Sequence, residues 1–196
     1  MKTILFIDGR NFLEKLEDVF ESEKSFVPEW KNYNFLGLLN HVLQGIRVDE
    51  SIFYFAKIRE HPDTKEKSQQ LIQELRMLKT HLEKQGFKIV LGGVVRGNYK
   101  KNRDGKNLLL FKEKGVDVSI AVDIVTAACD KKLKTAIIGS SDSDLQPAIR
   151  ELNKRSIESI YLGFEIMPNK GLAATTKRTI LIRNSEVIKF KEGLPI

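Results

Sequence analysis

Residues 3–11 read TILFIDGRN, an apolar run that ends in a carboxylate, a glycine, a cation and an amide. The run from Thr3 to Ile7 is short and rich in Ile and Phe, which is typical of a buried β-strand. Residues 11–20 then place Phe12, Leu16 and Phe20 at helical spacing. A strand that passes directly into a helix in this way is the beginning of an α/β arrangement.

The same alternation continues along the chain. We expect strands at 3–7, 51–58, 87–95, 135–139 and 159–162, and helices at 11–20, 35–46, 62–85, 116–129 and 145–152. Alternating strands and helices imply crossover connections, a mainly parallel sheet and helices on both of its faces. The sequence therefore predicts a three-layer αβα sandwich. In the helix at 116–129 we expect Val118, Val122, Val125 and Cys129 to face the core.

Composition limits the class of protein. The chain has 196 residues, 33 Lys and Arg against 26 Asp and Glu, and a formal net charge of +7. Its single cysteine excludes an internal disulfide and a zinc site built from cysteine pairs. No apolar run approaches the ~20 residues of a membrane helix, and Asp8 comes too early for a signal peptide. We expect one soluble, cytoplasmic domain over residues 1–196, whose excess of cations favours a polyanionic partner.

Several common catalytic signatures are missing from the sequence. It has no Gly-x-x-x-x-Gly-Lys-Ser/Thr loop, no Gly-x-Gly-x-x-Gly after the first strand, and no His-Glu-x-x-His or Gly-x-Ser-x-Gly motif. The three histidines, His41, His61 and His81, are widely separated, so we interpret them as surface or packing residues. Acidic side chains are the remaining candidates for chemistry.

Four aspartates are expected near the carboxyl ends of strands, where open α/β sheets bind their ligands. They are Asp8, Asp117, Asp142 and Asp144. Each has an alternative role at a helix start, as an N-cap or in the first turn, but one cap needs only one carboxylate. Two carboxylates about 4 Å apart repel by roughly 4 kcal/mol at an effective dielectric near 20, so a convergent cluster needs a cation or shared protons. All-oxygen ligands favour Mg²⁺ or Mn²⁺, which suits phosphodiester hydrolysis.

Asp123 lies in the middle of an expected helix among apolar residues. Six residues separate it from Asp117, which turns the helix by 600°, so the two side chains do not share a face. An unpaired buried charge is costly. The sequence leaves two interpretations of Asp123 open, a pair with a basic side chain or a place on an exposed face.

The segment over residues 96–114 contains seven cations against two carboxylates, and it leads directly to Asp117. It is typical of a loop or hairpin that contacts a nucleic-acid backbone, with a solvated loop as the alternative. The candidate nucleic-acid contacts, which also include a residue after the first strand, are Arg10, Arg96, Lys100, Lys101, Arg103, Lys106, Lys112 and Lys114.

Three ordered motifs resemble the NYN domain, and more narrowly its LabA-like (DUF88) branch within the PIN-like nuclease superfamily. They are FIDGRN at 6–11, KGVD at 114–117 with Asp123, and SDSD at 141–144. The resemblance implies an αβα sandwich and a Mg²⁺- or Mn²⁺-dependent ribonuclease in which Asp8, Asp117, Asp142 and Asp144 bind metal. It also implies that Asn11 orients a water or phosphate, that Ser141 supports the loop, and that Asp123 is a recurrent supporting position.

The first functional hypothesis is a metal-dependent endoribonuclease that acts on single-stranded or structured RNA. The second is an RNA-binding or scaffold module without turnover. A phosphatase with an aspartyl nucleophile is disfavoured, because Gly9 and Arg10 stand where that chemistry needs Asp-x-Asp. The sequence does not decide whether the protein forms a homodimer. It also leaves open whether the helix near residues 32–46 covers a cleft or a dimer interface.

Overall fold

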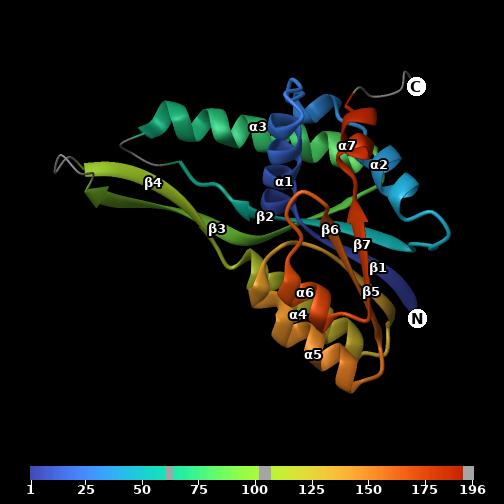
Figure 1. Cartoon of the computed structure of the whole chain (residues 1–196). Coiled ribbons are helices and arrows are strands. Elements are labelled where there is room, and N and C mark those ends of the chain that lie inside the picture. Colours follow the sequence, from blue (N-terminus) through green and yellow to red (C-terminus); the bar gives the residue numbers. More distant parts are fainter. Residues whose placement is uncertain (61–63, 102–106, 192–196) are drawn as a thin grey trace.

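The computed structural model describes residues 1–60, 64–101 and 107–191. Its centre is a seven-stranded sheet of order β4-β3-β2-β1-β5-β6-β7 (Figure 1). All neighbouring strands are parallel except β3 and β4, which pair antiparallel. The strands are β1 (Lys2–Asp8), β2 (Glu50–Lys57), β3 (Lys88–Lys101), β4 (Asn107–Lys114), β5 (Leu133–Gly139), β6 (Glu158–Phe164) and β7 (Arg178–Ile182).

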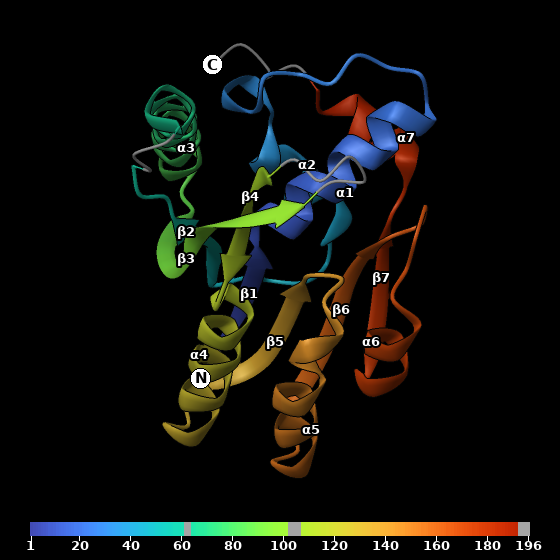
Figure 2. The ribbon, with the colours of Figure 1, turned by 90° about the vertical axis from the view of Figure 1, so that its left-hand side faces the viewer.

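Helices cover both faces of this sheet, as Figures 1 and 2 show. One layer contains α1 (Gly9–Ser22), α2 (Phe35–Val42), α3 (Lys65–Lys84) and α7 (Asn184–Lys189), and the other contains α4 (Val116–Cys129), α5 (Gln146–Lys154) and α6 (Lys170–Thr175). Two short 3₁₀ helices are η1 (Trp30–Asn32) and η3 (Ser143–Leu145). Each layer has its own buried apolar cluster against the sheet. The predicted αβα sandwich with a mainly parallel sheet is therefore confirmed.

The strand order creates a switch point at the centre of the sheet. From β1 the chain builds β2, β3 and β4 outward on one side, and then returns to place β5 on the other side of β1. The connections that leave β1 and β5 consequently run to opposite layers. Open α/β sheets bind ligands outside the carboxyl ends of the strands at such a point. This edge is where Asp8 ends β1 and where residues 140–142 follow β5.

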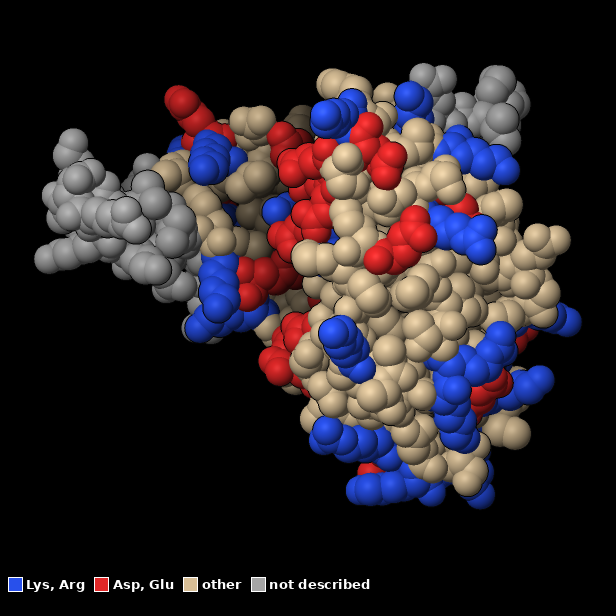
Figure 3. Space-filling model, in the orientation of Figure 1, with Lys and Arg blue, Asp and Glu red and all other residues tan. Residues whose placement is uncertain are grey.

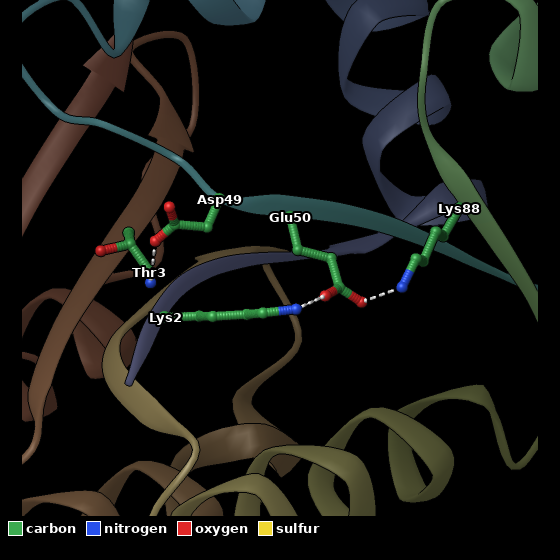
Figure 4. A network of polar contacts seen from close by, with 5 residues as sticks. All are labelled: Lys2, Thr3, Asp49, Glu50 and Lys88. Atoms are coloured by element: carbon green, nitrogen blue, oxygen red, sulfur yellow. Dashed lines mark hydrogen bonds and ion pairs between the residues drawn. The ribbon is translucent and has the colours of Figure 1, made fainter.

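The opposite ends of β1, β2 and β3 are joined by a polar network (Figure 4). Glu50 accepts hydrogen bonds from Lys2 Nζ at 3.1 Å and from Lys88 Nζ at 2.7 Å, and these contacts lower the pKa of Glu50. Asp49 accepts from the backbone N–H of Thr3 at 2.9 Å. Both lysines are solvent-exposed, so these ion pairs contribute little to stability.

The predicted core stripe of α4 is wrong at three of its four positions, since only Val125 is half-buried and packs against the core of that layer. Val118 and Val122 are 60% and 56% exposed, and Cys129 is also exposed. The helix instead buries Val116, Ile120, Ile124 and Ala128. Apolar residues occur around most of this helix, so more than one apolar stripe is compatible with helical spacing.

Several boundaries also differ from the prediction. The strand expected at 87–95 extends to Lys101 and forms an antiparallel hairpin with β4, one of the two forms expected of the basic segment. The start expected at Pro62 lies outside the described residues, and α3 begins at Lys65. The C-terminal elements α6, β7 and α7 were not predicted, because each spans only five or six residues.

Candidate active site

Three aspartates from two separate segments converge beside the switch point. Asp117 lies in the first turn of α4, Asp142 caps η3, and Asp144 lies within η3. Each offers a carboxylate oxygen, and the three oxygens all lie within 4.8 Å of one another. We call these residues the Asp triad. Asp117 and Asp142 are half-buried and Asp144 is exposed, so the triad has a solvent-accessible side.

Asp8, the fourth predicted carboxylate, lies outside that triad but lines the same cleft as Asp117 and Asp142. Its side chain accepts from the Asn11 backbone N–H at 3.1 Å, which caps α1. It is only 8% exposed. Burial raises the pKa of Asp8 to about 6, with a further increase from the charge of Asp142, although the Asn11 bond opposes this. The capping role and the place in the cleft thus coexist in one side chain.

The loop that carries Asp142 is held by amide side chains. Asn11 Oδ1 accepts from the Ser141 backbone N–H at 2.7 Å, which joins α1 to the loop after β5. On the other side, Asn169 donates to the Ser141 backbone carbonyl at 2.8 Å and to Ser143 Oγ at 3.0 Å. Asn11 and Ser141, both predicted as supporting residues, therefore contact each other directly. Asn169 was missed, since 25 residues separate it from the motif and its pattern indicates only the N-cap of α6.

Two glutamates in the cleft were also missed as site residues. Glu14 lies one turn beyond Arg10 on α1 and forms an ion pair with it at 2.8 Å. Glu113 lies on β4 between two lysines and was counted only against the basic charge of its segment. Burial, followed by the charge of Asp8, raises the pKa of Glu113 to about 7. Helical spacing from Arg10 was a signal that could have found Glu14. Glu113 had no such signal, because strand alternation separates neighbouring side chains instead of grouping them.

Cations border the acidic cleft. Lys112 and Lys114 are exposed on β4 and line the cleft together with Arg10 and Lys67. In Figure 3 acidic side chains gather along a hollow on this face of the molecule, with Lys and Arg side chains next to them. Of the other predicted cationic contacts, Arg96, Lys100 and Lys101 lie in β3, whereas Arg103 and Lys106 lie outside the described residues.

Asp123 is not placed near the triad. Its carboxylate accepts from the Tyr54 hydroxyl at 2.9 Å, and both residues line a separate hollow with Lys2. The partner of Asp123 is therefore a phenol rather than the basic side chain considered from the sequence. The burial of Tyr54 and its bond to Asp123 raise the pKa of the phenol. This contact joins α4 to β2 at some distance along the helix from Asp117.

The cleft has a volume of about 660 Å³, and its lining includes Asp8, Asp117 and Asp142. Carboxylate oxygens are the ligands that hard divalent cations prefer. The surrounding lysines are suited to phosphate oxygens. The arrangement can therefore hold a divalent cation and a phosphodiester side by side.

The fold and this cleft define an α/β protein of the PIN-like nuclease type. Comparison with protein families matches the NYN domain over residues 2–183, and the chain therefore belongs to the NYN family, which is part of the PIN-like nuclease superfamily. A crystal structure of a protein of unknown function from Vibrio parahaemolyticus is similar, with a TM-score of 0.54 and 19% identity. The match covers 92% of this chain and 93% of that one, and it supports the fold.

No curated protein matches the chain significantly. Within the described residues, every helix is too short or too polar to cross a membrane.

Proposed function

We propose that this NYN protein is a ribonuclease that hydrolyses phosphodiester bonds in single-stranded or structured RNA and depends on Mg²⁺ or Mn²⁺. The convergence of three carboxylates to within 4.8 Å at the mouth of a lysine-bordered cleft is the observation that carries this proposal. Membership of the NYN family supports nuclease chemistry. The motifs at 6–11, 114–117 and 141–144 support placement in its LabA-like branch, and the single sheet supports one domain over 1–196.

The donor set fits a hard divalent cation. Asp117, Asp142 and Asp144 offer only oxygen ligands, and three carboxylates this close are electrostatically unfavourable without a compensating positive charge. These three residues would hold the metal, with Asp8 next to them. When bound, the metal would activate a water and stabilise charge at the phosphate.

The protein's own side chains would supply position and charge. Lys112 and Lys114 would bind phosphate oxygens of the RNA strand and neutralise their charge. Asn11 would fix the loop that presents Asp142 through its bond to Ser141. Asp8 would hold negative charge beside the triad, because its raised pKa of about 6 still leaves it ionised at neutral pH.

Cleavage of a labelled single-stranded RNA tests the proposal. Asp142→Asn is expected to reduce the cleavage rate by at least about a hundredfold while the fold is retained, because it removes a charged metal ligand. The matched control is Asp130→Asn, an exposed aspartate paired with Lys132 far from the cleft, which should cleave like the wild type. Equal cleavage by Asp142→Asn and the wild type would refute the assignment. Salt-sensitive RNA binding without cleavage under Mg²⁺ or Mn²⁺ would instead favour the alternative of a binding module.

A further inference from the structure

A second hollow adjoins the cleft and has a different character. It has a volume of about 410 Å³ and lies between α1, α3, η1 and the end of β2. Its walls are mainly apolar and include Leu13, Phe55, Leu75 and Leu78, with Trp30 at one side. We call it the apolar groove. Pockets of roughly 300–1,000 Å³ are of the size that holds small organic groups.

The apolar groove is continuous with the cleft. Arg10, Ile58, Leu71, Val95 and Glu113 line both hollows. A strand whose phosphate lies in the cleft would therefore have a neighbouring nucleotide at the mouth of the groove. Glu113 lies where the cleft and the groove meet, because it lines both hollows.

The charges of the two hollows differ. The cleft has four cations against five carboxylates, whose charge a bound divalent cation would offset, and three of those cations, Lys67, Lys112 and Lys114, do not line the groove. The groove contains four glutamates against one arginine and one lysine. This excess of carboxylates repels phosphate, so the groove is suited to the uncharged part of a nucleotide. Aromatic and apolar walls are what an unpaired base needs for stacking and burial.

One of these glutamates has a free acceptor. Glu17 accepts from Trp30 Nε1 at 3.3 Å, Glu74 accepts from Gln70 at 2.9 Å, and Glu29 pairs with Lys31 at 3.0 Å. The Glu113 side chain accepts from the Ala56 backbone N–H, but its Oε1 is buried and has no hydrogen-bond partner among the described residues. An unpaired buried acceptor is costly, and a donor brought by a ligand would remove that cost.

We propose that the apolar groove binds one unpaired nucleobase next to the scissile phosphate, and that Glu113 favours a base with an exocyclic amino group. This inference rests on the proposed function, since it places the phosphate of the same strand in the cleft. The cytosine N4 amino group donates to a carboxylate oxygen, whereas uracil has a carbonyl oxygen at that position and would repel it. Glu113 is thus a specificity-determining residue and the groove a base subsite.

The test measures binding without turnover, in EDTA, so that it is independent of cleavage. It is run at about pH 8.5, because Glu113, whose pKa is raised to about 7, is then ionised and can only accept hydrogen bonds. The probes are an oligocytidine and an oligouridine octamer, which differ at the base edge but are both flexible single strands. Trp30 is the chain's single tryptophan, so its intrinsic fluorescence reports occupancy of the groove. Oligocytidine is expected to change the Trp30 fluorescence and to bind about tenfold more tightly than oligouridine, the effect of one hydrogen bond to a charged group.

A pair of variants assigns the preference to Glu113. Glu113→Gln should bring the two affinities to within about twofold, because an amide can both accept from cytosine and donate to uracil. The control Glu74→Gln changes another groove carboxylate, which already has a partner, and should keep the preference. The wild-type comparison needs no variant and is therefore decisive even if Glu113→Gln fails to fold.

Two results would overturn the inference: equal affinity of the wild type for both octamers, or binding with no change in Trp30 fluorescence. If the wild type cleaves RNA but gives either result, the base subsite is refuted and the proposed function stands. If the base preference appears without any cleavage under Mg²⁺ or Mn²⁺, the subsite stands and the nuclease proposal fails.

Discussion

Replacing Asp8 by Asn is expected to stabilise the metal-free protein at neutral pH. The Asp8 carboxylate is buried, and its pKa is raised from an ordinary value of 3.8 to about 6, mainly by loss of solvation. Folding therefore disfavours the charged form. Asn keeps an oxygen that can accept from the Asn11 backbone N–H, so the cap of α1 is retained without the buried charge.

The magnitude follows from proton linkage. Because the folded pKa is the higher one, the contribution of Asp8 to stability is fully present below about pH 4 and is lost as the pH rises through about 6. The difference in pKa corresponds to a cost of about 3 kcal/mol at about pH 7.5, and to about 1 kcal/mol at about pH 4.5. Asp8→Asn should therefore raise the free energy of unfolding by much of this cost at the higher pH, and by little at the lower pH.

Urea unfolding in EDTA at these two pH values measures the effect. The control Asp130→Asn removes an exposed carboxylate and should change the free energy of unfolding by less than about 0.5 kcal/mol. Cleavage by Asp8→Asn should be strongly reduced despite the added stability. This is the result expected if the buried carboxylate serves function and destabilises the fold. A variant that is less stable than the wild type at about pH 7.5, or one whose gain is the same at both pH values, would refute the reasoning.

Two further predictions concern the loop after β5 and the cationic border of the cleft. Asn11→Ala removes the 2.7 Å hydrogen bond to the backbone N–H of Ser141 in that loop. It should lower the free energy of unfolding, measured in urea, by about 1 kcal/mol. It should lower the cleavage rate by more than about tenfold, because Asp142 is no longer held in place. The double variant Lys112→Ala and Lys114→Ala should weaken RNA binding and reduce the slope of log affinity against log salt by about 1.4, or about 0.7 for each phosphate that is no longer neutralised. Fluorescence anisotropy at several salt concentrations measures that slope. Lys131→Ala, on the far side of the molecule, should leave it unchanged.

Much of the fold was predictable because local patterns and the sheet agree. The apolar run at 3–7 is buried on both sides of the sheet, so its strand can be predicted from composition alone. The same logic failed in α4, where Val118 and Val122 carry the spacing of a core face yet are exposed. Which apolar stripe faces the sheet is decided by how the helix lies on it, and spacing contains no information about that.

The site residues likewise divide into those with a local sequence signal and those that only the tertiary arrangement brings to the cleft. Asp8, Asp117 and Asp142 each follow a local signal, a strand end or a helix start, and parallel topology brings such positions to one edge. Glu113 belongs to the cleft only because β4 folds back antiparallel to β3, which places it opposite Val95. Asn169 reaches the loop from a distant helix start. Contacts of this kind arise from the tertiary arrangement and have no pattern within their own segments.

The most direct test of the central claim is the rate of RNA cleavage as a function of Mn²⁺ concentration, for the wild type and for Asp144→Asn. Asp144 is the most exposed member of the Asp triad, so its replacement is expected to disturb the fold least. We predict that the wild type is inactive in EDTA and saturates with Mn²⁺, and that Asp144→Asn needs at least about tenfold more metal for half its maximal rate. Cleavage that persists in EDTA, or an identical metal requirement in both proteins, would contradict the assignment of the triad as the metal site.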